Sequence, residues 1–268
     1  MNVALRLQSY GVEVSMVSSV GDDKEGNRII KYIGNSGVNT DGIQISPNYG
    51  TGQVNVVLND KGVASYDIAY PVAWDKILPR KYYESQLKIS DIFIYGSLAC
   101  RDNTSRTTLK QLLHVAQYKV FDVNLRAPHY TKELLLELMQ PANFVKFNDD
   151  ELYEVAGYLG SKYNSMEQTI AFVAEKTQTE TICVTKGAYG AVLYHQKIFY
   201  YNSGYRIKVL DTVGSGDSFL ASVIYKLFSG EGPQAAINFG CAVGAMVAKS
   251  EGANPIFTMQ KISRFMNP

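Results

Sequence analysis

The turn Asp211-Thr212-Val213-Gly214-Ser215-Gly216-Asp217 contains the residues best suited to chemistry. Its two glycines let the backbone turn tightly and approach a ligand. Apolar Ile207 and Val209 predict a strand before the turn, and the apolar run from Phe219 predicts a helix after it. The free N–H groups in the first turn of that helix would face a bound anion.

Asp217 admits two interpretations from its position at the start of this helix. It could cap the helix, since aspartate is common at helix starts. It could also take a proton from a hydroxyl while a phosphoryl group is transferred to that oxygen. The turn lacks the Gly-Lys-Ser/Thr of a Walker A loop and is not a dinucleotide fingerprint. Spacing alone therefore leaves both interpretations open.

Three further segments carry polar groups, glycines or small residues. In Asn148-Asp149-Asp150-Glu151, helical spacing lets Asn148 and Glu151 point together, although Asn148 and Asp149 could simply cap a helix. The segment Thr185-Lys186-Gly187-Ala188-Tyr189-Gly190 could be the glycine turn of a hairpin. The small residues of 238–252 could reflect close helix packing.

Composition narrows the classes of function. The chain has 268 residues, is 46% hydrophobic and has a formal net charge of +1, which fits a folded domain with a large core. No basic block is present, so a nucleic-acid partner is not expected, and no stretch has the length of a membrane span. The cysteines, Cys100, Cys183 and Cys241, are far apart and form no metal-ligand spacing with the histidines. We therefore expect a reducing, cytoplasmic location without a disulfide framework.

From residue 80 onward, short apolar strands alternate with helices, a pattern typical of a doubly wound, mostly parallel α/β sheet with helices on both faces. We expect strands at 12–20, 91–95, 120–123, 144–147 and 181–185, helices at 22–35, 103–117, 131–139, 149–156, 166–176, 217–228, 233–249 and 258–265, and hairpins at 52–70 (turning at Asn59-Asp60-Lys61-Gly62) and 191–201. This order predicts a single α/β domain over residues 1–268, with a small β lid at about 50–72.

The motif Asp-Thr-x-Gly-x-Gly-Asp-x-Phe at residues 211–219 resembles the signature of ribokinase-like (PfkB-type) carbohydrate kinases, and the chain looks closest to bacterial fructokinases. The resemblance implies a ribokinase-like α/β fold. It also implies that the backbone of Gly214, Ser215 and Gly216 forms the anion hole for the transferring phosphate, and that Asp217 is the catalytic base. Many relatives have Ala in place of Ser215, a small change that leaves the role of the backbone intact.

The same resemblance implies sites for ATP and its cations. Asn148-x-x-Glu151 is similar to a motif that organises Mg²⁺ through water, with Asn148 also at the nucleotide. The other implied ATP contacts are Thr185, Gly187, Gly190, Gly216 and, on the adenine side, Cys241. A K⁺ ion held mainly by backbone oxygens would contact Asp211, Val213, Val247, Ser250 and Gly252.

On the sugar side, the segment 121–126 resembles the Asp-x-Asn-x-Arg strand end of fructokinases and 2-keto-3-deoxygluconate kinases. Ligands of open α/β sheets bind outside the carboxyl ends of the strands, where this segment is expected to lie. The implied acceptor contacts are Asn2, Gly96, Asn124, Arg126 and Asp217. Tyr70 and Trp74 could close on the sugar as lid aromatics, or could pack within the lid.

Relatives begin with a core strand that carries a sugar-binding aspartate, and a Gly-Gly loop ending in Asn follows. Here Met1-Asn2 resembles the end of that loop, so we expect either a truncated product or a short form with severely reduced activity.

Taken together, the resemblance implies an ATP-dependent kinase of a small carbohydrate, with fructose as the expected acceptor. The alternatives are a kinase for 2-keto-3-deoxygluconate, ribose or a nucleoside, and a non-catalytic relative that senses a nucleotide or a sugar. Lid strands in this family often pair between subunits, so we expect a homodimer through residues 50–72.

Overall fold

The computed structural model describes residues 1–58 and 64–267, and the chain divides into two compact units. Unit 1 consists of Met1–Val14, Ile92–Leu98 and Tyr118–Pro268, and unit 2 of Ser15–Asp91 and Ala99–Gln117. The expectation of one domain over the whole chain stays a prediction.

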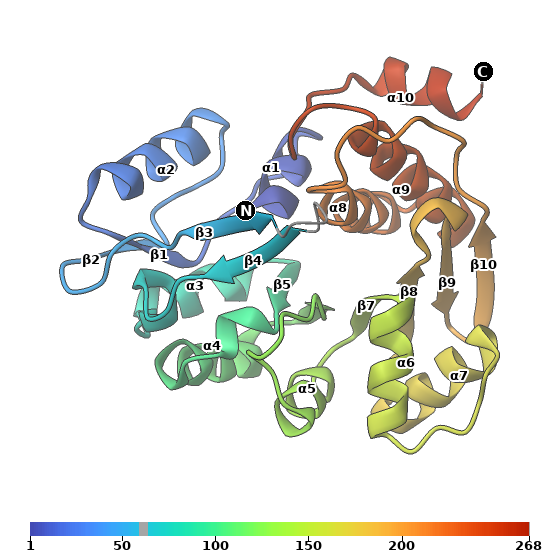
Figure 1. Cartoon of the computed structure of the whole chain (residues 1–268), viewed down its shortest axis with the longest axis horizontal. Coiled ribbons are helices and arrows are strands. Elements are labelled where there is room, and N and C mark those ends of the chain that lie inside the picture. The colour runs from blue at the N-terminus through green and yellow to red at the C-terminus, as the bar shows by residue number, and fades with distance from the viewer. Residues whose placement is uncertain (59–63, 268) are drawn as a thin grey trace. The chain divides into compact units, whose positions relative to one another are not determined.

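A six-stranded mixed sheet forms the centre of unit 1 (Figure 1). In spatial order its strands are β10 (Ile198–Asn202), β9 (Ala191–His195), β8 (Thr181–Thr185), β7 (Phe144–Asn148), β6 (Tyr118–Asp122) and β5 (Ile92–Gly96). Strands β5 to β8 pair in parallel, whereas β9 and β10 are antiparallel to their neighbours. The sheet confirms the predicted strands 91–95, 120–123, 144–147 and 181–185 and the hairpin at 191–201, with shifts of one to two residues at their ends.

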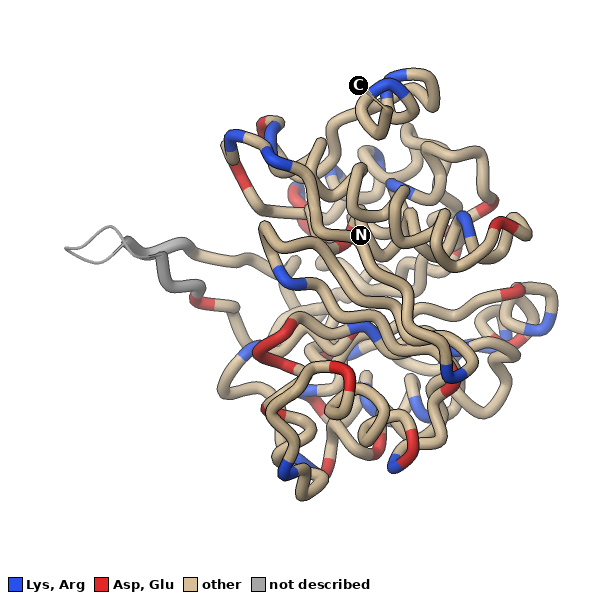
Figure 2. Tube along the Cα trace, turned by 90° about the vertical axis from the view of Figure 1, so that its right-hand side faces the viewer, with Lys and Arg blue, Asp and Glu red and all other residues tan. Residues whose placement is uncertain are grey.

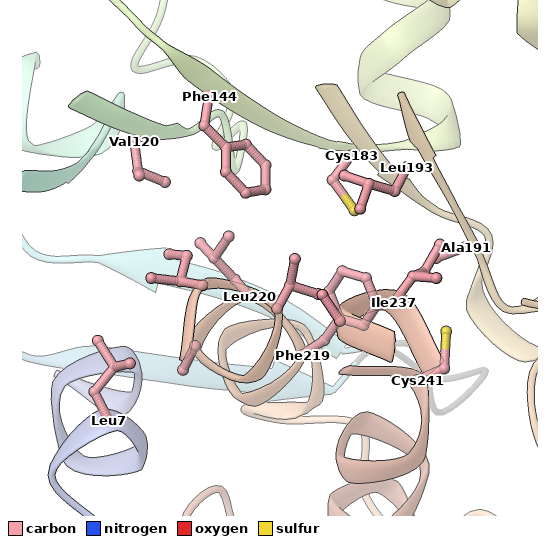
Figure 3. Close-up of a cluster of buried hydrophobic side chains, with 14 residues drawn as sticks. Leu7, Val120, Phe144, Cys183, Ala191, Leu193, Phe219, Leu220, Ile237 and Cys241 are labelled. Carbon is pink, nitrogen blue, oxygen red and sulfur yellow. The ribbon is translucent and has the colours of Figure 1, made fainter. Parts of the chain in front are cut away.

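Helices cover both faces of this sheet, as predicted. They are α1 (Asn2–Gln8), α5 (Lys132–Met139), α6 (Asp149–Tyr158), α7 (Met166–Thr177), α8 (Ser215–Phe228), α9 (Pro233–Ala248) and α10 (Met259–Met266). On one face, Phe219 and Ile237 of α8 and α9 pack against Phe144 and Leu193 of the sheet (Figure 3). On the other face, the Tyr95 hydroxyl donates to the Leu138 carbonyl of α5, and α6 and α7 contact β7 and β8.

Unit 2 contains two small sheets with their helices. Its elements are β1 (Ser18–Gly21), α2 (Lys24–Asn35), β2 (Ile43–Ser46), β3 (Val54–Leu58), β4 (Ala64–Ile68), the 3-10 helix η1 (Ala73–Lys76), α3 (Lys81–Ile89) and α4 (Asn103–Val115), with the 3-10 helix η2 (Leu98–Cys100) at the unit boundary. Strands β3 and β4 pair antiparallel, which confirms the predicted hairpin, while its turn at Asn59-Asp60-Lys61-Gly62 lies outside the described residues.

Tyr70 and Trp74, the two aromatic residues expected near the lid, are held within unit 2 by one arginine. The Arg101 guanidinium lies 4.1 Å from the centre of the Trp74 ring and 5.1 Å from that of Tyr70. Arg101 also pairs with the fully buried carboxylate of Asp75, at 2.7 Å. These contacts fit the packing alternative for Trp74, whereas Tyr70 is 57% exposed despite its contact with Arg101. A sugar contact from either of them stays a prediction.

Two sequence expectations differ from the structure. The strand expected at 12–20 is confined to Ser18–Gly21, because Val12 and Val14 pack against the core of unit 1 instead. The strand expected at Ile207 and Val209 is absent, and Val209 is largely exposed. One strand and one α-helix were not foreseen: β2, which has only four residues, and α3, whose buried residues are only Tyr83 and Leu87.

Charges are interspersed along the described chain, and Figure 2 shows no long run of either sign on the trace. None of the described helices is long and apolar enough to cross a membrane.

The connection between β8 and β9 requires a glycine at one position. Gly190 has φ +79°, and a Cβ there would overlap the Asn202 carbonyl oxygen and the Gly204 nitrogen. Gly187, in the 3-10 helix η3 (Gly187–Tyr189) of the same connection, has φ +53° but open space around its α-carbon. The conformation alone therefore constrains Gly187, whereas conformation and packing together constrain Gly190.

We expect Gly187→Ala to lower the free energy of unfolding by about 1–2 kcal/mol, the strain of a left-handed residue. Gly190→Ala should lower it by about 3 kcal/mol or more, because the methyl group also displaces backbone. Urea unfolding of the two variants measures both values, with Gly187→Ala as the matched control. Equal losses would show that the close approach of Asn202 and Gly204 is unimportant.

Candidate active site

Four parallel strands end at one edge of the sheet in unit 1, and predicted site residues stand at these ends. The register pairs Gly96 of β5 with Asp122 of β6, and Asn148 of β7 with Thr185 of β8. Asp122 is in turn paired with Lys146 of β7. Because the carboxyl ends of parallel strands share one edge, chain segments far apart in sequence bring their polar groups to one place.

The turn before α8 leaves two backbone donors free. Gly214, the N-cap, has φ +76°, and a Cβ there would lie 2.6 Å from the Ala253 carbonyl oxygen, so only glycine fits. The helix starts at Ser215. In the described part of the chain, the N–H groups of Gly216 and Asp217 donate to no carbonyl or side chain. These donors and the helix dipole make the turn suitable for an anion.

Asp217 does not cap α8, so the capping interpretation is wrong. Its carboxylate Oδ2 accepts a hydrogen bond of 2.8 Å from the Asn2 side-chain amide. Asn2 is itself held by Asn254, whose amide donates to Asn2 Oδ1 at 2.9 Å. The carboxylate is thus oriented by side chains remote in sequence and stays beside the free N–H groups of the turn.

One buried arginine ties α1 to α8 and to the loop after α9. Arg6 is 3% exposed, and its Nε donates to the Ser218 hydroxyl at 3.2 Å. Its Nη2 donates to the Pro255 carbonyl at 2.8 Å. Since Asn2 lies one turn before Arg6 on α1, this arginine fixes the helix that carries the partner of Asp217.

Lys146 and Asp122 form a buried ion pair. Asp122 belongs to the Asp-x-Asn-x-Arg segment singled out in the sequence, whereas Lys146 was not expected at the site. Lys146 Nζ lies 3.1 Å from Asp122 Oδ1, and the two side chains are 9% and 11% exposed. Burial opposes the charge of Lys146, but the carboxylates of Asp122, Glu151 and Asp217 together raise its pKa above the ordinary value. The signal was present in the sequence, since a lysine rarely occurs within an apolar run such as 144–147 unless it is paired.

Asn148 and Glu151 form a reciprocal capping box at the start of α6. Asn148 Oδ1 accepts from the backbone N–H of Glu151, and Glu151 Oε2 accepts from the backbone N–H of Asn148, each at 2.8 Å. Glu151 Oε1 accepts from the Leu125 amide at 2.9 Å, which connects this motif to the segment after β6. Capping is therefore observed for Asn148, with Glu151 and not Asp149 as its partner, and it brings the Asn148 and Glu151 side chains together as their spacing predicted.

These residues fit Mg²⁺ as outer-shell groups. Each Glu151 oxygen accepts one backbone hydrogen bond and keeps further acceptor capacity for a water molecule. Within residues 1–58 and 64–267, no group of three or more His, Cys, Asp or Glu side chains could hold a metal directly. Because Mg²⁺ usually keeps several of its waters and binds substrate phosphates, Asn148 and Glu151 suit contact through those waters.

The residues expected at the nucleotide occupy two places in unit 1. Thr185 donates from its hydroxyl to the Phe147 carbonyl at 3.3 Å and begins the connection that contains Gly187 and Gly190. Cys241 lies on α9 in the core cluster of Figure 3, and burial raises its pKa to about 12. No hydrogen bond or ion pair of the described residues joins Cys241 to the turn before α8.

The residues expected at the acceptor follow the ends of β5 and β6. A Cβ on Gly96 would lie 3.3 Å from the Asp122 carbonyl oxygen, so this position has little room for a side chain. Asn124 has the unusual φ of 41°. Arg126 is exposed, and its Nη1 donates to the Leu125 carbonyl at 2.7 Å. Only Asn2 among the predicted acceptor contacts is hydrogen-bonded to Asp217 in the described structure.

Two backbone segments bring the expected K⁺ contacts together. The amides of Leu210 and Asp211 both donate to the Ala248 carbonyl, at 2.8 and 3.2 Å. Residues 211–213 therefore lie beside residues 247–252. A further hydrogen bond joins the Val213 amide to Asp211 Oδ1 at 2.9 Å. The amides of Leu210 and Asp211, directly before the turn, are therefore used on the end of α9 and not in a sheet.

Comparison with known proteins identifies relatives of the chain. The sequence model of the pfkB family of carbohydrate kinases matches residues 1–259. Over 271 residues the chain is 25% identical to a fructokinase-2 of Solanum habrochaites, an alignment that covers 95% of this chain and 81% of that protein.

Solved structures show the same fold. A 2-dehydro-3-deoxygluconokinase from Thermotoga maritima has a TM-score of 0.87 at 19% identity, with 100% of this chain and 88% of that chain covered. A fructokinase from Vibrio cholerae, solved with fructose, ADP and a calcium ion bound, has a TM-score of 0.83 at 21% identity, with 99% and 89% covered. These likenesses confirm the predicted ribokinase-like fold class.

Burial of the three thiols should lower their reactivity in the folded chain. Cys100, Cys183 and Cys241 are all buried, and the pKa of Cys241 is raised to about 12. Because only the thiolate reacts with iodoacetamide, we expect native alkylation of Cys241 to stay slow from about pH 7 to about pH 10, where an ordinary thiol ionises. Mass spectrometry measures the modification, and the guanidinium-unfolded chain should react at all three positions. Rapid native alkylation at pH 8 would show that Cys241 is accessible.

Proposed function

We propose fructose, or a similar small carbohydrate, as the acceptor for this chain, which belongs to the pfkB family of carbohydrate kinases. Members of such a family are phosphotransferases that act on a sugar hydroxyl, and the coarse activity of the chain follows from this membership. The proposal also assigns a base, a nucleotide, cations and an acceptor. It is supported chiefly by the Asp217 carboxylate, which lies beside unpaired backbone donors in a turn that requires glycine.

In this proposal Asp217 takes the proton of the acceptor hydroxyl as the bond between that oxygen and phosphorus forms. The backbone of the Gly214–Gly216 turn stabilises the charge that develops on the transferring group. Because the Ser215 N–H donates to the Thr212 carbonyl at 3.2 Å, the neighbouring N–H groups of Gly216 and Asp217 are the free donors for this role in the described part of the chain. Asn2 holds the Asp217 carboxylate by donating its side-chain amide to Oδ2. A sugar hydroxyl bound at that oxygen would also lie within reach of the Asn2 amide. The exclusion of water from the site prevents hydrolysis of the nucleotide.

ATP is the proposed donor. Mg²⁺, when bound, neutralises charge on the phosphates, with Asn148 and Glu151 contacting its waters. Thr185, Gly187 and Gly190 contact the nucleotide from the connection after β8, and Cys241 lies on its adenine side. K⁺ would be held by backbone oxygens of the paired segments 211–213 and 247–252, which lie side by side.

The acceptor assignment depends on Gly96, Asn124 and Arg126. Their positions after the ends of β5 and β6 suit contact with a polar ligand at that edge of the sheet. The alternative acceptor of the same chemistry is 2-keto-3-deoxygluconate, because the exposed guanidinium of Arg126 could pair with its carboxylate. The fold shared with the Thermotoga maritima kinase is compatible with this alternative.

The hairpin of β3 and β4 is the proposed contact of a homodimer. These strands pair only with each other in the described residues, so both outer edges of the hairpin can accept another strand. Val54 at the start of β3 is 55% exposed, which fits a surface that a second copy covers. Light scattering after size exclusion should give twice the chain mass, and Val54→Lys should shift it toward the monomer. A monomer at micromolar concentration would reject this part of the proposal.

The decisive test of the base is Asp217→Asn. We expect turnover to fall by about 10²- to 10⁴-fold, because the amide cannot accept the hydroxyl proton, while ATP affinity changes little. A coupled ADP-release assay with Mg²⁺ and K⁺ measures turnover, and calorimetry measures affinity. Asp41→Asn, at an exposed position of unit 2, is the control and should leave both unchanged.

The same assay identifies the acceptor when it is run with fructose, ribose, 2-keto-3-deoxygluconate, adenosine and fructose 6-phosphate. Turnover with fructose that Asp217→Asn removes would support the proposal. Turnover with another member of the panel would replace fructose as the acceptor. Unchanged turnover in Asp217→Asn would reject the assigned base, and silence with ATP still bound would indicate a sensing relative.

A further inference from the structure

Lys146 is a buried cation whose burial calls for an explanation. Its neighbours in β7, Val145 and Phe147, are fully buried, and its own side chain is 9% exposed. An ammonium group is removed from water at considerable cost unless it is paired. Among the residues that the structure describes, its ion-pair partner is Asp122, at 3.1 Å.

The ion pair leaves the ammonium group with unused donors. An ammonium has three N–H donors, and the single Asp122 contact accounts for at most one of them. Asp122 Oδ1 is itself without a partner of hydrogen-bond geometry in the described structure. A buried pair of this kind is stable only when further hydrogen bonds satisfy the remaining donors and acceptors. Lys146 therefore has N–H donors available for a further polar partner.

The ammonium lies against the turn before α8. A Cβ placed on Gly216 would have Lys146 Nζ as its nearest neighbour, at 3.7 Å. The N–H groups of Gly216 and Asp217 are in the same place and lack acceptors within the described residues. A cation with spare donors and two free amides thus converge on one small region, which suits a dianionic or more highly charged oxyanion.

We propose that Lys146 is a catalytic residue whose ammonium contacts the terminal phosphoryl group of the nucleotide, and that Asp122 is the positioning residue that holds it against the Gly214–Gly216 turn. This inference rests on the proposed function, and it adds a side-chain cation to an anion site otherwise built from backbone. During transfer the acceptor oxygen bonds to phosphorus, the bond from phosphorus to the β-phosphate oxygen breaks, and the negative charge leaves on ADP. Asp217 takes the hydroxyl proton, and Lys146 remains protonated throughout.

A purely structural role would give a different outcome. If Lys146 only neutralised Asp122, its loss would disturb the edge of the sheet and affect every nucleotide alike. If Lys146 contacts the terminal phosphoryl group, its loss weakens the binding of a nucleotide with three phosphates and leaves the binding of one with two phosphates unchanged. The difference between the affinities of an ATP analogue and ADP therefore separates the two roles without reference to turnover.

The experiment compares Lys146→Met with Lys119→Met in the full chain. Lys119 is at the start of β6, at the opposite edge of the same sheet, so it is a matched control for the loss of one positive charge. Calorimetry with Mg²⁺ and either the non-hydrolysable analogue AMP-PNP or ADP gives the affinities. We expect Lys146→Met to weaken the affinity for AMP-PNP by about 10-fold or more and the affinity for ADP by less than about 2-fold. The kcat should fall by about 10²-fold. Lys119→Met should change none of these.

Removal of Lys146 alone leaves Asp122 buried without a cation and could prevent folding. The double variant Lys146→Met with Asp122→Asn removes both charges at similar volume, so it keeps the test available. It should show the same selective loss of AMP-PNP affinity. Asp122→Asn alone should lower kcat with the sugar KM unchanged, and Asp122→Glu should recover part of that loss.

Equal weakening of AMP-PNP and ADP, or no change in either, in the double variant would overturn the inference. This outcome is distinct from failure of the proposed function. A wild-type chain that phosphorylates no sugar, yet shows the selective loss on removal of Lys146, would keep the phosphoryl contact and reject the acceptor. A wild-type chain that phosphorylates fructose while Lys146→Met is indistinguishable from Lys119→Met would keep the function and reject the role of Lys146.

Discussion

Parallel pairing of β5, β6, β7 and β8 is the constraint on which the site depends. Parallel strands need a crossover between them, so each strand ends at the same edge, and a loop or a helix follows there. The register places Gly96 opposite Asp122, and Asn148 opposite Thr185. A slip of one residue in any pairing would turn Asp122 or Lys146 to the opposite face of the sheet and replace it with an apolar neighbour.

Buried charge is the second requirement of this arrangement. Asp122 and Lys146 are in adjacent strands, and Asp217 and Glu151 are close enough for their carboxylates to act on the pKa of Lys146. In a low-dielectric interior such charges interact strongly, and each would be costly alone. The apolar core on the same face, where Phe144 packs with Phe219 and Leu220, supplies the hydrophobic stabilisation that offsets this desolvation.

Much of unit 1 could be predicted from sequence, because its strands are short apolar runs and its helices carry clear N-caps such as Thr131 and Ser165. That Asn148 and Glu151 lie together could be predicted from their spacing, whereas their reciprocal hydrogen bonds are seen only in the structure. The segment at Ile207 and Val209 could not be predicted correctly, because its alternation resembles a strand while its neighbouring backbone donates to Ala248 at the end of α9. A sequence pattern shows which residues are apolar, but it does not show which other segment of the chain forms hydrogen bonds with their backbone.

The orientation of Asp217 shows the same limit at the site itself. The glycine-rich turn identifies this aspartate as a candidate base, but the turn does not fix where the carboxylate points. That direction comes from Asn2, 215 positions away in sequence, and from Asn254, which holds Asn2. Arg6 adds to this by bonding α1 to both Ser218 and Pro255. The chemistry of the residue is local, whereas its geometry is a property of the packed unit, so a motif specifies a catalytic group only together with the segments that hold it.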